Sequence, residues 1–186
     1  MARTGAIGLV GAVAAETAGM GKTTLLLALG LVAAGCHAAP CGGCADWETC
    51  NAATDECVLN SGTRFDLVAD DGDVPGDSWD PFFGPPDPYI CASDGVDEQC
   101  SSIQSDDSSP KWNETLLTGL DGSALLTMTL SFDYEDSDLD SPDLICSGGV
   151  TLTAAELHAG GFRFNCSNGS SARFTLHNTD RGAPVL

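Results

Sequence analysis

The sequence predicts an all-β fold, a sandwich of antiparallel strands, and three observations support this. Short runs in which apolar and polar residues alternate recur throughout residues 61–179. Glycine, aspartate and proline fill the gaps between these runs, as is typical of turns. Residues 153–158 are the one segment with the pattern of a helical turn, with Thr153 as its N-cap. Short strands at regular spacing, separated by such turns, are typical of a β-sandwich.

The individual strands are expected where an apolar face can turn toward a core. The clearest are residues 115–120 and 125–132, in which apolar side chains recur at nearly every second position. The other expected strands are residues 65–69, 89–92, 101–104, 163–166 and 172–176.

Length and composition limit the classes of function. The chain has 186 residues, which is room for one ordinary domain and a smaller segment. Nine cysteines against three methionines indicate an oxidising compartment. The net charge of −20 argues against a nucleic-acid partner, whose phosphates need clustered Lys and Arg. It would also repel an anionic lipid surface unless a cation intervened.

Residues 1–35 have the features of a signal peptide, and Met20 is the expected start of translation. Lys22 precedes an apolar run over residues 25–34, which is too short to span a bilayer as a helix. The small residues before Cys36 resemble the lipobox of bacterial lipoproteins, although Ala33 stands where leucine is usual. The resemblance implies that Cys36 is lipidated and anchors an exported protein in the cell envelope, at the outer membrane or cell surface. The alternative is a buried apolar helix with an incidental cysteine.

Two other functional patterns are weak. Residues 19–24 imitate the end of a nucleotide-binding P-loop, but Glu16 occupies the position of its first glycine, so no nucleotide is expected. The histidines are scattered and none lies beside a candidate nucleophile in the sequence. They are His37, His158 and His177. The sequence therefore predicts no enzyme.

Eight further cysteines suit four disulfides. Four of them lie in residues 36–60, a spacer with too little apolar mass for a core of its own, and are expected to pair among themselves; they are Cys41, Cys44, Cys50 and Cys57. The alternative for these four is a zinc knuckle of four thiolates. In the sandwich we expect the pairs Cys91–Cys100 and Cys146–Cys166, because each would bracket neighbouring strands.

Residues 131–145 contain the densest group of carboxylates, in a segment whose pattern predicts the end of a strand followed by an acidic loop. Such a loop repels itself unless a hard cation neutralises it, and calcium selects flexible sites with roughly six to eight oxygen ligands. A second acidic loop covers residues 77–87, and a Pro-Lys-Trp-Asn-Glu segment at residues 110–114 lies between the two. A solvated acidic turn is the alternative, since Asp and Ser favour turns.

These three pieces, in this order, resemble the C2 domain, a calcium-dependent, membrane-binding β-sandwich. The resemblance covers residues 63–176 and implies an eight-stranded antiparallel fold, although Cys146 stands where glycine is usual. It implies that Asn113 and Glu114 have a structural role and are not calcium ligands. In the acidic loop at residues 77–87, Asp77 would be the ligand if Asp80 does not bind calcium. The calcium ligands that it implies are Asp80, Asp87, Asp136, Asp138 and Asp143.

Two functions are compatible with these features. In the first, a lipid-anchored calcium-binding module binds membrane lipid or a cell-surface component, with Trp79, Phe82 and Phe83 dipping into the interface. In the second, the chain is a structural envelope lipoprotein in which calcium, if bound, only stabilises the fold. Residues 180–186 are expected to form a C-terminal tail.

Overall fold

The computed structural model describes residues 41–76, 84–138 and 141–180. The chain divides into two units after Cys36, and every described residue belongs to the second, His37–Leu186. Its elements are β1 (Glu48–Asn51), β2 (Glu56–Leu59), β3 (Arg64–Asp73), β4 (Pro88–Ser93), β5 (Glu98–Cys100), β6 (Lys111–Asp121), α1 (Gly122–Leu125), β7 (Leu130–Asp136), β8 (Asp143–Val150), α2 (Ala154–Ala159), β9 (Gly161–Asn165) and β10 (Ser171–Asn178). In the described part of the chain, no helix is long and apolar enough to cross a membrane.

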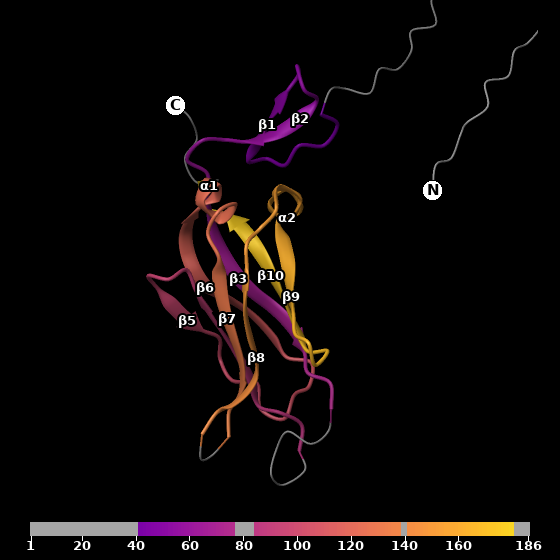
Figure 1. The fold of residues 1–186 in the computed structure, drawn as a ribbon, viewed down its shortest axis with the longest axis vertical. Helices are drawn as coiled ribbons and strands as arrows, with labels where there is room; N and C mark the ends of the chain where they lie inside the picture. Colours follow the sequence, from indigo (N-terminus) through magenta and orange to yellow (C-terminus); the bar gives the residue numbers. More distant parts are fainter. Residues whose placement is uncertain (1–40, 77–83, 139–140, 181–186) are drawn as a thin grey trace, which may run out of the picture. The chain divides into compact units, whose positions relative to one another are not determined.

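Two four-stranded sheets form the body of the second unit (Figure 1). Their strand orders are β6-β3-β10-β9 and β5-β4-β7-β8, and all the pairings are antiparallel. The prediction of an all-β antiparallel sandwich is confirmed.

The core lies between the two sheets and follows from the alternation of the sequence. In β7 the side chains of Leu130, Phe132 and Tyr134 are buried, whereas Ser131 and Asp133 between them are exposed. The ring of Phe132 packs against aromatic rings of the opposite sheet, with centroids 5.9, 5.3 and 4.7 Å from those of Phe162, Phe164 and Phe174. Burial of these rings supplies much of the hydrophobic stabilisation of the sandwich.

A small disulfide-bonded hairpin precedes the sandwich; we call residues 41–59 the knot. Strands β1 and β2 pair in it, and the bonds Cys41–Cys50 and Cys44–Cys57 hold it together. Trp47 packs edge-on against Phe65 at the start of β3, with ring centroids 5.5 Å apart. The predicted pairing within this segment is confirmed, and because all four thiols are in disulfides, the four-thiolate zinc knuckle is not formed.

The two disulfides predicted for the sandwich and the predicted helical turn are also confirmed. Cys91–Cys100 joins the neighbouring strands β4 and β5, and Cys146–Cys166 joins β8 to the end of β9. Thr153 caps α2 by accepting the N–H of Glu156, whose carboxylate accepts the N–H of Thr153 in return. This is a capping box.

Three expectations about strands were wrong. Residues 101–104 are not a strand, because their backbone is used by side chains of β6: Trp112 Nε1 donates to the Ser102 carbonyl. Leu125 belongs to α1, which Asp121 caps, so β7 starts only at Leu130. Residues 143–150, expected partly as an acidic loop, form the edge strand β8.

Candidate functional site

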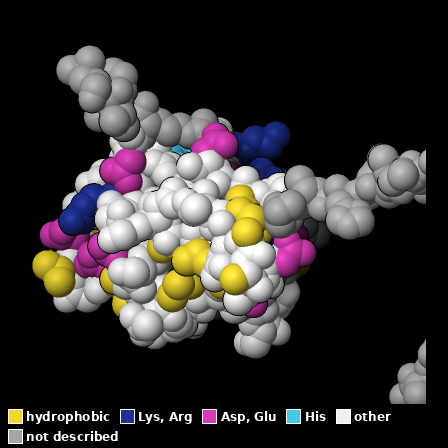
Figure 2. All heavy atoms as spheres, turned by 90° about the horizontal axis from the view of Figure 1, so that it is seen from above, with side chains coloured by type: hydrophobic (Ala, Val, Ile, Leu, Met, Phe, Trp, Pro, Cys, Tyr) yellow, Lys and Arg dark blue, Asp and Glu magenta, His cyan; other side chains and the backbone are white. Residues whose placement is uncertain are grey.

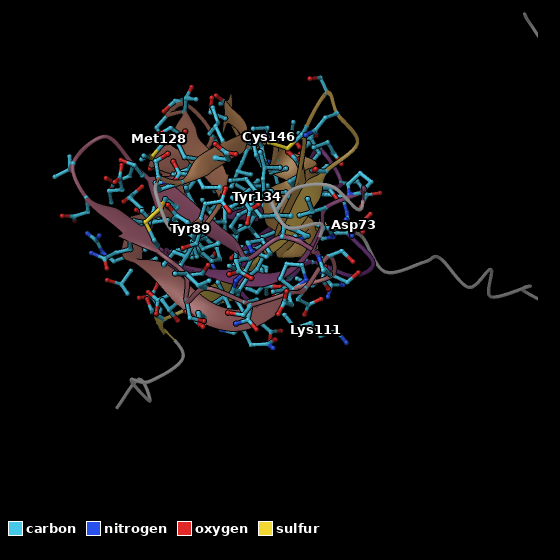
Figure 3. All side chains as sticks on the ribbon, turned by 90° about the horizontal axis from the view of Figure 1, so that it is seen from below. Asp73, Tyr89, Lys111, Met128, Tyr134 and Cys146 are labelled. Atoms are coloured by element: carbon cyan, nitrogen blue, oxygen red, sulfur yellow. A yellow bond between two sulfur atoms is a disulfide. The ribbon has the colours of Figure 1, made fainter. Side chains whose placement is uncertain are left out.

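One end of the sandwich gathers the acidic loops, and we call it the loop end. It is formed by the described parts of residues 74–87, 101–110 and 137–142, which connect β3 to β4, β5 to β6 and β7 to β8. Figure 1 shows it opposite the helices α1 and α2, and Figure 3 views the unit from it. Because antiparallel strands start and finish alternately at the two ends of a sheet, alternate connections meet here.

Strand register brings three of the predicted ligands together. Asp136 at the end of β7 is the register partner of Asp143 on β8 and of Pro88 on β4, and Asp87 immediately precedes Pro88. Asp87, Asp136 and Asp143 thus lie at the ends of three adjacent strands. Asp138 follows two residues after β7 and is half-buried.

Asp87 joins the three loops of this end through hydrogen bonds. Its N–H donates to Oδ1 of Asp136 at 2.6 Å, and its own Oδ1 accepts the N–H of Asp106 at 2.6 Å. Its carbonyl oxygen accepts the N–H of Ser137 at 3.0 Å. The acidic side chains therefore organise the backbone here as well as carrying charge.

Asp136 has an environment unlike that of an ordinary loop carboxylate. Its side chain is 1% exposed, because it continues the inward-facing row of Phe132 and Tyr134 on β7. A buried carboxylate is costly unless it is hydrogen-bonded or compensated by a positive charge. The Asp87 N–H supplies one such bond, to Oδ1 of Asp136.

The sequence reasoning missed a third group of acids at this end. Asp106 and Asp107 lie in the connection from β5 to β6, and Asp73 is the last residue of β3. Asp107 donates its N–H to the Pro86 carbonyl at 2.9 Å, so this loop is tied to the first one. The signal that could have found it is the pair of adjacent aspartates in a polar turn before Pro110.

The Trp-Asn-Glu segment of β6 holds this third loop in place. The carboxylate of Glu114 accepts the N–H of Ser102 at 2.8 Å and its hydroxyl at 2.5 Å, beside the bond from Trp112 to the same residue. Asn113 has a positive φ of 53°. These contacts agree with the structural role that the resemblance implied for this segment.

Two tyrosines near the loop end have raised pKa values. Burial, the hydrogen bond to Glu135 and the charge of Glu135 raise the pKa of Tyr89 from 10.0 to about 12. Burial, followed by the negative charges of Asp73 and Asp107, raises the pKa of Tyr134 as well. Tyr134 lies between the sheets, as Figure 3 shows. The negative charges of Asp73 and Asp107 at the loop end therefore influence a side chain in the core.

The donor chemistry of the loop end suits a hard cation, because the candidate side chains offer only carboxylate oxygen. Across residues 41–76, 84–138 and 141–180, however, the one group of three His, Cys, Asp or Glu side chains with ligand atoms within 4.8 Å is Cys44, Glu48 and Cys57, in the knot. The described loop-end carboxylates are therefore not drawn together as a ligand shell. Asp80 with its substitute Asp77, and the side chains of Trp79, Phe82 and Phe83, lie outside the described residues, as do Cys36, His37 and the expected signal peptide.

Comparison with known proteins gives one kind of result. No protein-family model matches the sequence, and neither does any curated protein. Among solved structures, a C2 domain matches 62% of this chain and 97% of its own, at 15% identity and a TM-score of 0.46. The C2A domain of plant Extended Synaptotagmin 1 matches 64% and 95%, at 14% identity and a TM-score of 0.47. Human GIVD cytosolic phospholipase A2 matches 64% of this chain over 18% of its own, at 15% identity and a TM-score of 0.45.

These likenesses concern the course of the backbone, and at such identities they say nothing about ligands. The described sandwich is similar in fold to C2 domains, as the resemblance of its sequence implied.

Proposed function

We propose that this protein is an exported, lipid-anchored binding module whose loop end takes calcium and, through it, a membrane lipid or a cell-surface component. The observation that carries the proposal is the register that sets Asp87, Asp136 and Asp143 at the ends of three adjacent strands. Asp138 in the same loop, and Asp80 beyond the described residues, complete the proposed ligand set. Calcium bound there would add positive charge to this group of carboxylates.

The charge of the chain supports a cation-dependent partner. At a net charge of −20, the protein is repelled by anionic headgroups and glycans unless a cation lies between them. Calcium is coordinated by six to eight oxygens, so coordination positions that the protein does not occupy can be filled by oxygens of the partner. Trp79, Phe82 and Phe83, in the first acidic loop, are the side chains proposed to contact the partner surface.

The module is proposed to be non-enzymatic. His158 is engaged with Glu48 in the knot, 2.6 Å away, and His177 is exposed on β10. The carboxylates of the loop end serve backbone hydrogen bonds and the proposed cation.

A thermal melt with calcium, magnesium and chelator tests the cation. Binding to the folded state alone stabilises it by about 2.7 kcal/mol at a hundredfold excess over Kd. Magnesium should do much less, because it requires near-octahedral geometry and gives up water reluctantly. Asp138→Asn should remove most of the calcium-dependent rise in Tm. Asp133→Asn is the matched control, since Asp133 is an exposed aspartate in the middle of β7 and its loss should leave the rise unchanged.

Flotation with anionic vesicles then tests whether the protein binds lipid or is a structural lipoprotein. Calcium-dependent flotation that is lost when Trp79, Phe82 and Phe83 are replaced by alanine would support lipid binding. Calcium stabilisation without flotation would leave a surface partner or a structural lipoprotein, and no calcium response in the parent would remove the site. Lipid labelling that persists in Cys36→Ser would reject the proposed anchor.

A further inference from the structure

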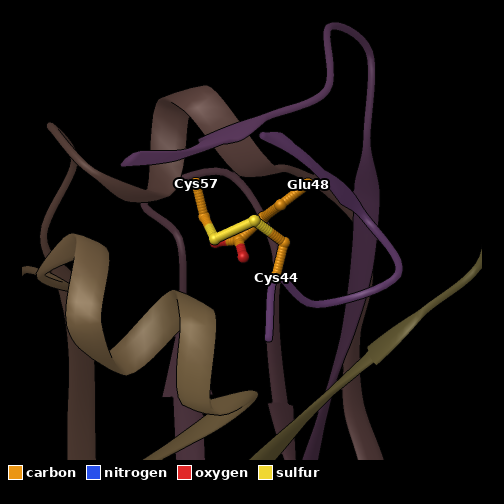
Figure 4. Close-up of side chains that lie close together, drawn as sticks. All are labelled: Cys44, Glu48 and Cys57. Carbon is orange, nitrogen blue, oxygen red and sulfur yellow. A yellow bond between two sulfur atoms is a disulfide. The ribbon is translucent and has the colours of Figure 1, made fainter. Parts of the chain in front are cut away.

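A second cluster of ligand-type side chains lies in the knot, away from the loop end. Ligand atoms of Cys44, Glu48 and Cys57 are all within 4.8 Å of one another, and each of these residues is half-buried. Figure 4 shows the Glu48 carboxylate beside the Cys44–Cys57 disulfide. Their side chains therefore converge on one point of the knot.

A fourth potential ligand, from the sandwich, lies next to Glu48. His158 on α2 places its Nδ1 2.6 Å from Oε2 of Glu48, although the two residues are 110 positions apart. The Glu48 side chain is 6% exposed and the His158 side chain 44%. The capping box at Thr153 and the burial of Leu157 fix the turn that carries this histidine.

The position of Glu48 is fixed by a second contact besides the one to His158. Its Oε2 also accepts the N–H of Ala45 at 2.9 Å, within the same loop of the knot. Seen from this end of the unit, acidic side chains are interspersed with apolar ones (Figure 2). The pocket between the knot and α2, about 580 Å³ in volume and lined by Glu48, Cys57 and His158 among others, gives solvent access to the cluster.

We propose that reduction of the Cys44–Cys57 disulfide creates a site for a thiophilic divalent cation such as zinc, with Cys44, Cys57, Glu48 and His158 as ligands. A dithiol reductant breaks the S–S bond with two electrons and becomes a disulfide itself, and its two protons pass to the sulfur atoms of Cys44 and Cys57. Zinc then binds both sulfurs as thiolates and releases those two protons. Cysteine sulfur, histidine nitrogen and carboxylate oxygen are all zinc ligands in proteins, and the four side chains would supply the four positions of a tetrahedral site.

The site can form only after reduction, because the sulfur atoms of Cys44 and Cys57 cannot bind zinc as thiolates while they are bonded to each other. In the oxidised protein each sulfur is bonded to the other, and no thiolate is present. The other disulfide of the knot, Cys41–Cys50, is not part of the cluster. Zinc would join the knot to α2, so that a metal bridge replaces the covalent one when the disulfide is lost. This site does not depend on the function proposed for the loop end.

Two variants with the same number of cysteines test the site in the full chain. Both carry Cys36→Ser, so that no anchor thiol contributes. C41S/C50S retains the proposed thiolates, and C44S/C57S retains the other pair. Each is reduced with a dithiol, which is then removed without air, and is titrated with zinc against a chromophoric chelator. We expect one zinc per chain for C41S/C50S, binding on the order of 100-fold or more tighter than C44S/C57S, and no such binding before reduction.

Glu48→Gln and His158→Ala, each in the C41S/C50S chain, test the other two ligands. Each should weaken zinc binding by about tenfold or more. Cobalt absorption provides a readout independent of affinity, because it reports the number of thiolates and tetrahedral geometry. Equal zinc affinity of the two cysteine variants would overturn the site. So would a cobalt spectrum of the C41S/C50S chain that is unchanged by either further substitution.

Discussion

At the scale of single residues, Gly72 occupies a position in the core with no room for a side chain. A Cβ there would lie 2.5 Å from the hydroxyl oxygen of Tyr134, 3.0 Å from Trp112 and 3.2 Å from Pro110. We therefore expect Gly72→Ala to lower the free energy of unfolding by about 1–3 kcal/mol, the usual cost of overpacking. Urea denaturation measures it.

Tyr134→Phe provides the control for this contact. Within the described residues the buried Tyr134 hydroxyl has no hydrogen-bond partner, so its removal should be nearly neutral or stabilising. The cost of Gly72→Ala should be smaller in the Tyr134→Phe background, because the nearest clashing atom is gone. Equal costs in both backgrounds would show that the strain comes from Trp112 and Pro110 instead.

The raised pKa of Tyr89 predicts that the free energy of unfolding falls in alkali. Its folded pKa is about 12 against 10.0 for a free phenol, so the stability it contributes is complete below pH 10 and is lost as the pH rises toward 12. Ultraviolet titration of the phenolates should show this raised pKa. Glu135→Gln should lower it by removing the negative charge, although burial, the larger cause, remains. A titration unaffected by this substitution would contradict the role of Glu135.

At the scale of elements, the Cys146–Cys166 bond joins the two sheets at one edge. It connects β8, the edge strand of one sheet, to the residue after β9, the edge strand of the other, across 20 positions of sequence. Loop-closure entropy predicts a loss of about 3 kcal/mol in unfolding free energy when both cysteines become alanine.

The matched comparison is C91A/C100A, whose bond spans 9 positions within one sheet. It should cost somewhat less, about 2.6 kcal/mol on the same entropic basis. Denaturant unfolding of the two variants measures both losses of unfolding free energy and shows which is larger. A larger loss for C91A/C100A would mean that native contacts, not loop closure, set these energies.

At the scale of the whole molecule, the net charge of −20 predicts that salt stabilises the fold. Self-repulsion among the acids is screened as ionic strength rises, and the Debye length falls from about 30 Å at 0.01 M to about 10 Å at 0.1 M. The Tm should therefore rise over this range in sodium chloride and equally in choline chloride, which excludes a specific sodium site. A falling Tm would indicate that ion pairs such as Arg173–Asp71 outweigh the repulsion.

Local pattern alone determined much of this protein. Alternation identified the cores of β3, β6 and β10, because side chains on a strand face opposite sides in turn. The cap at Thr153 located α2, and the two disulfides of the sandwich were predicted from the strands that each pair of cysteines brackets. The acidic loops were visible as composition.

Only the tertiary structure decided which of these pieces meet. Residues 101–104 look like a strand by themselves, yet Trp112 and Glu114 hold the backbone of Ser102 as part of a loop. Strand β8 is recognisable only through its pairing with β7, which also places Asp143 beside Asp136.

The contact between Glu48 and His158 shows the same limit most clearly. Glu48 and His158 are 110 residues apart, and nothing in the sequence near either one points to the other. Periodicity and turn chemistry act over a few residues, so the sequence by itself determined only the elements with a clear local pattern, such as β3, β6, β10 and α2. Sites made of residues from distant elements depend on strand pairing and packing between the sheets, and these are set by the free energy of the whole fold.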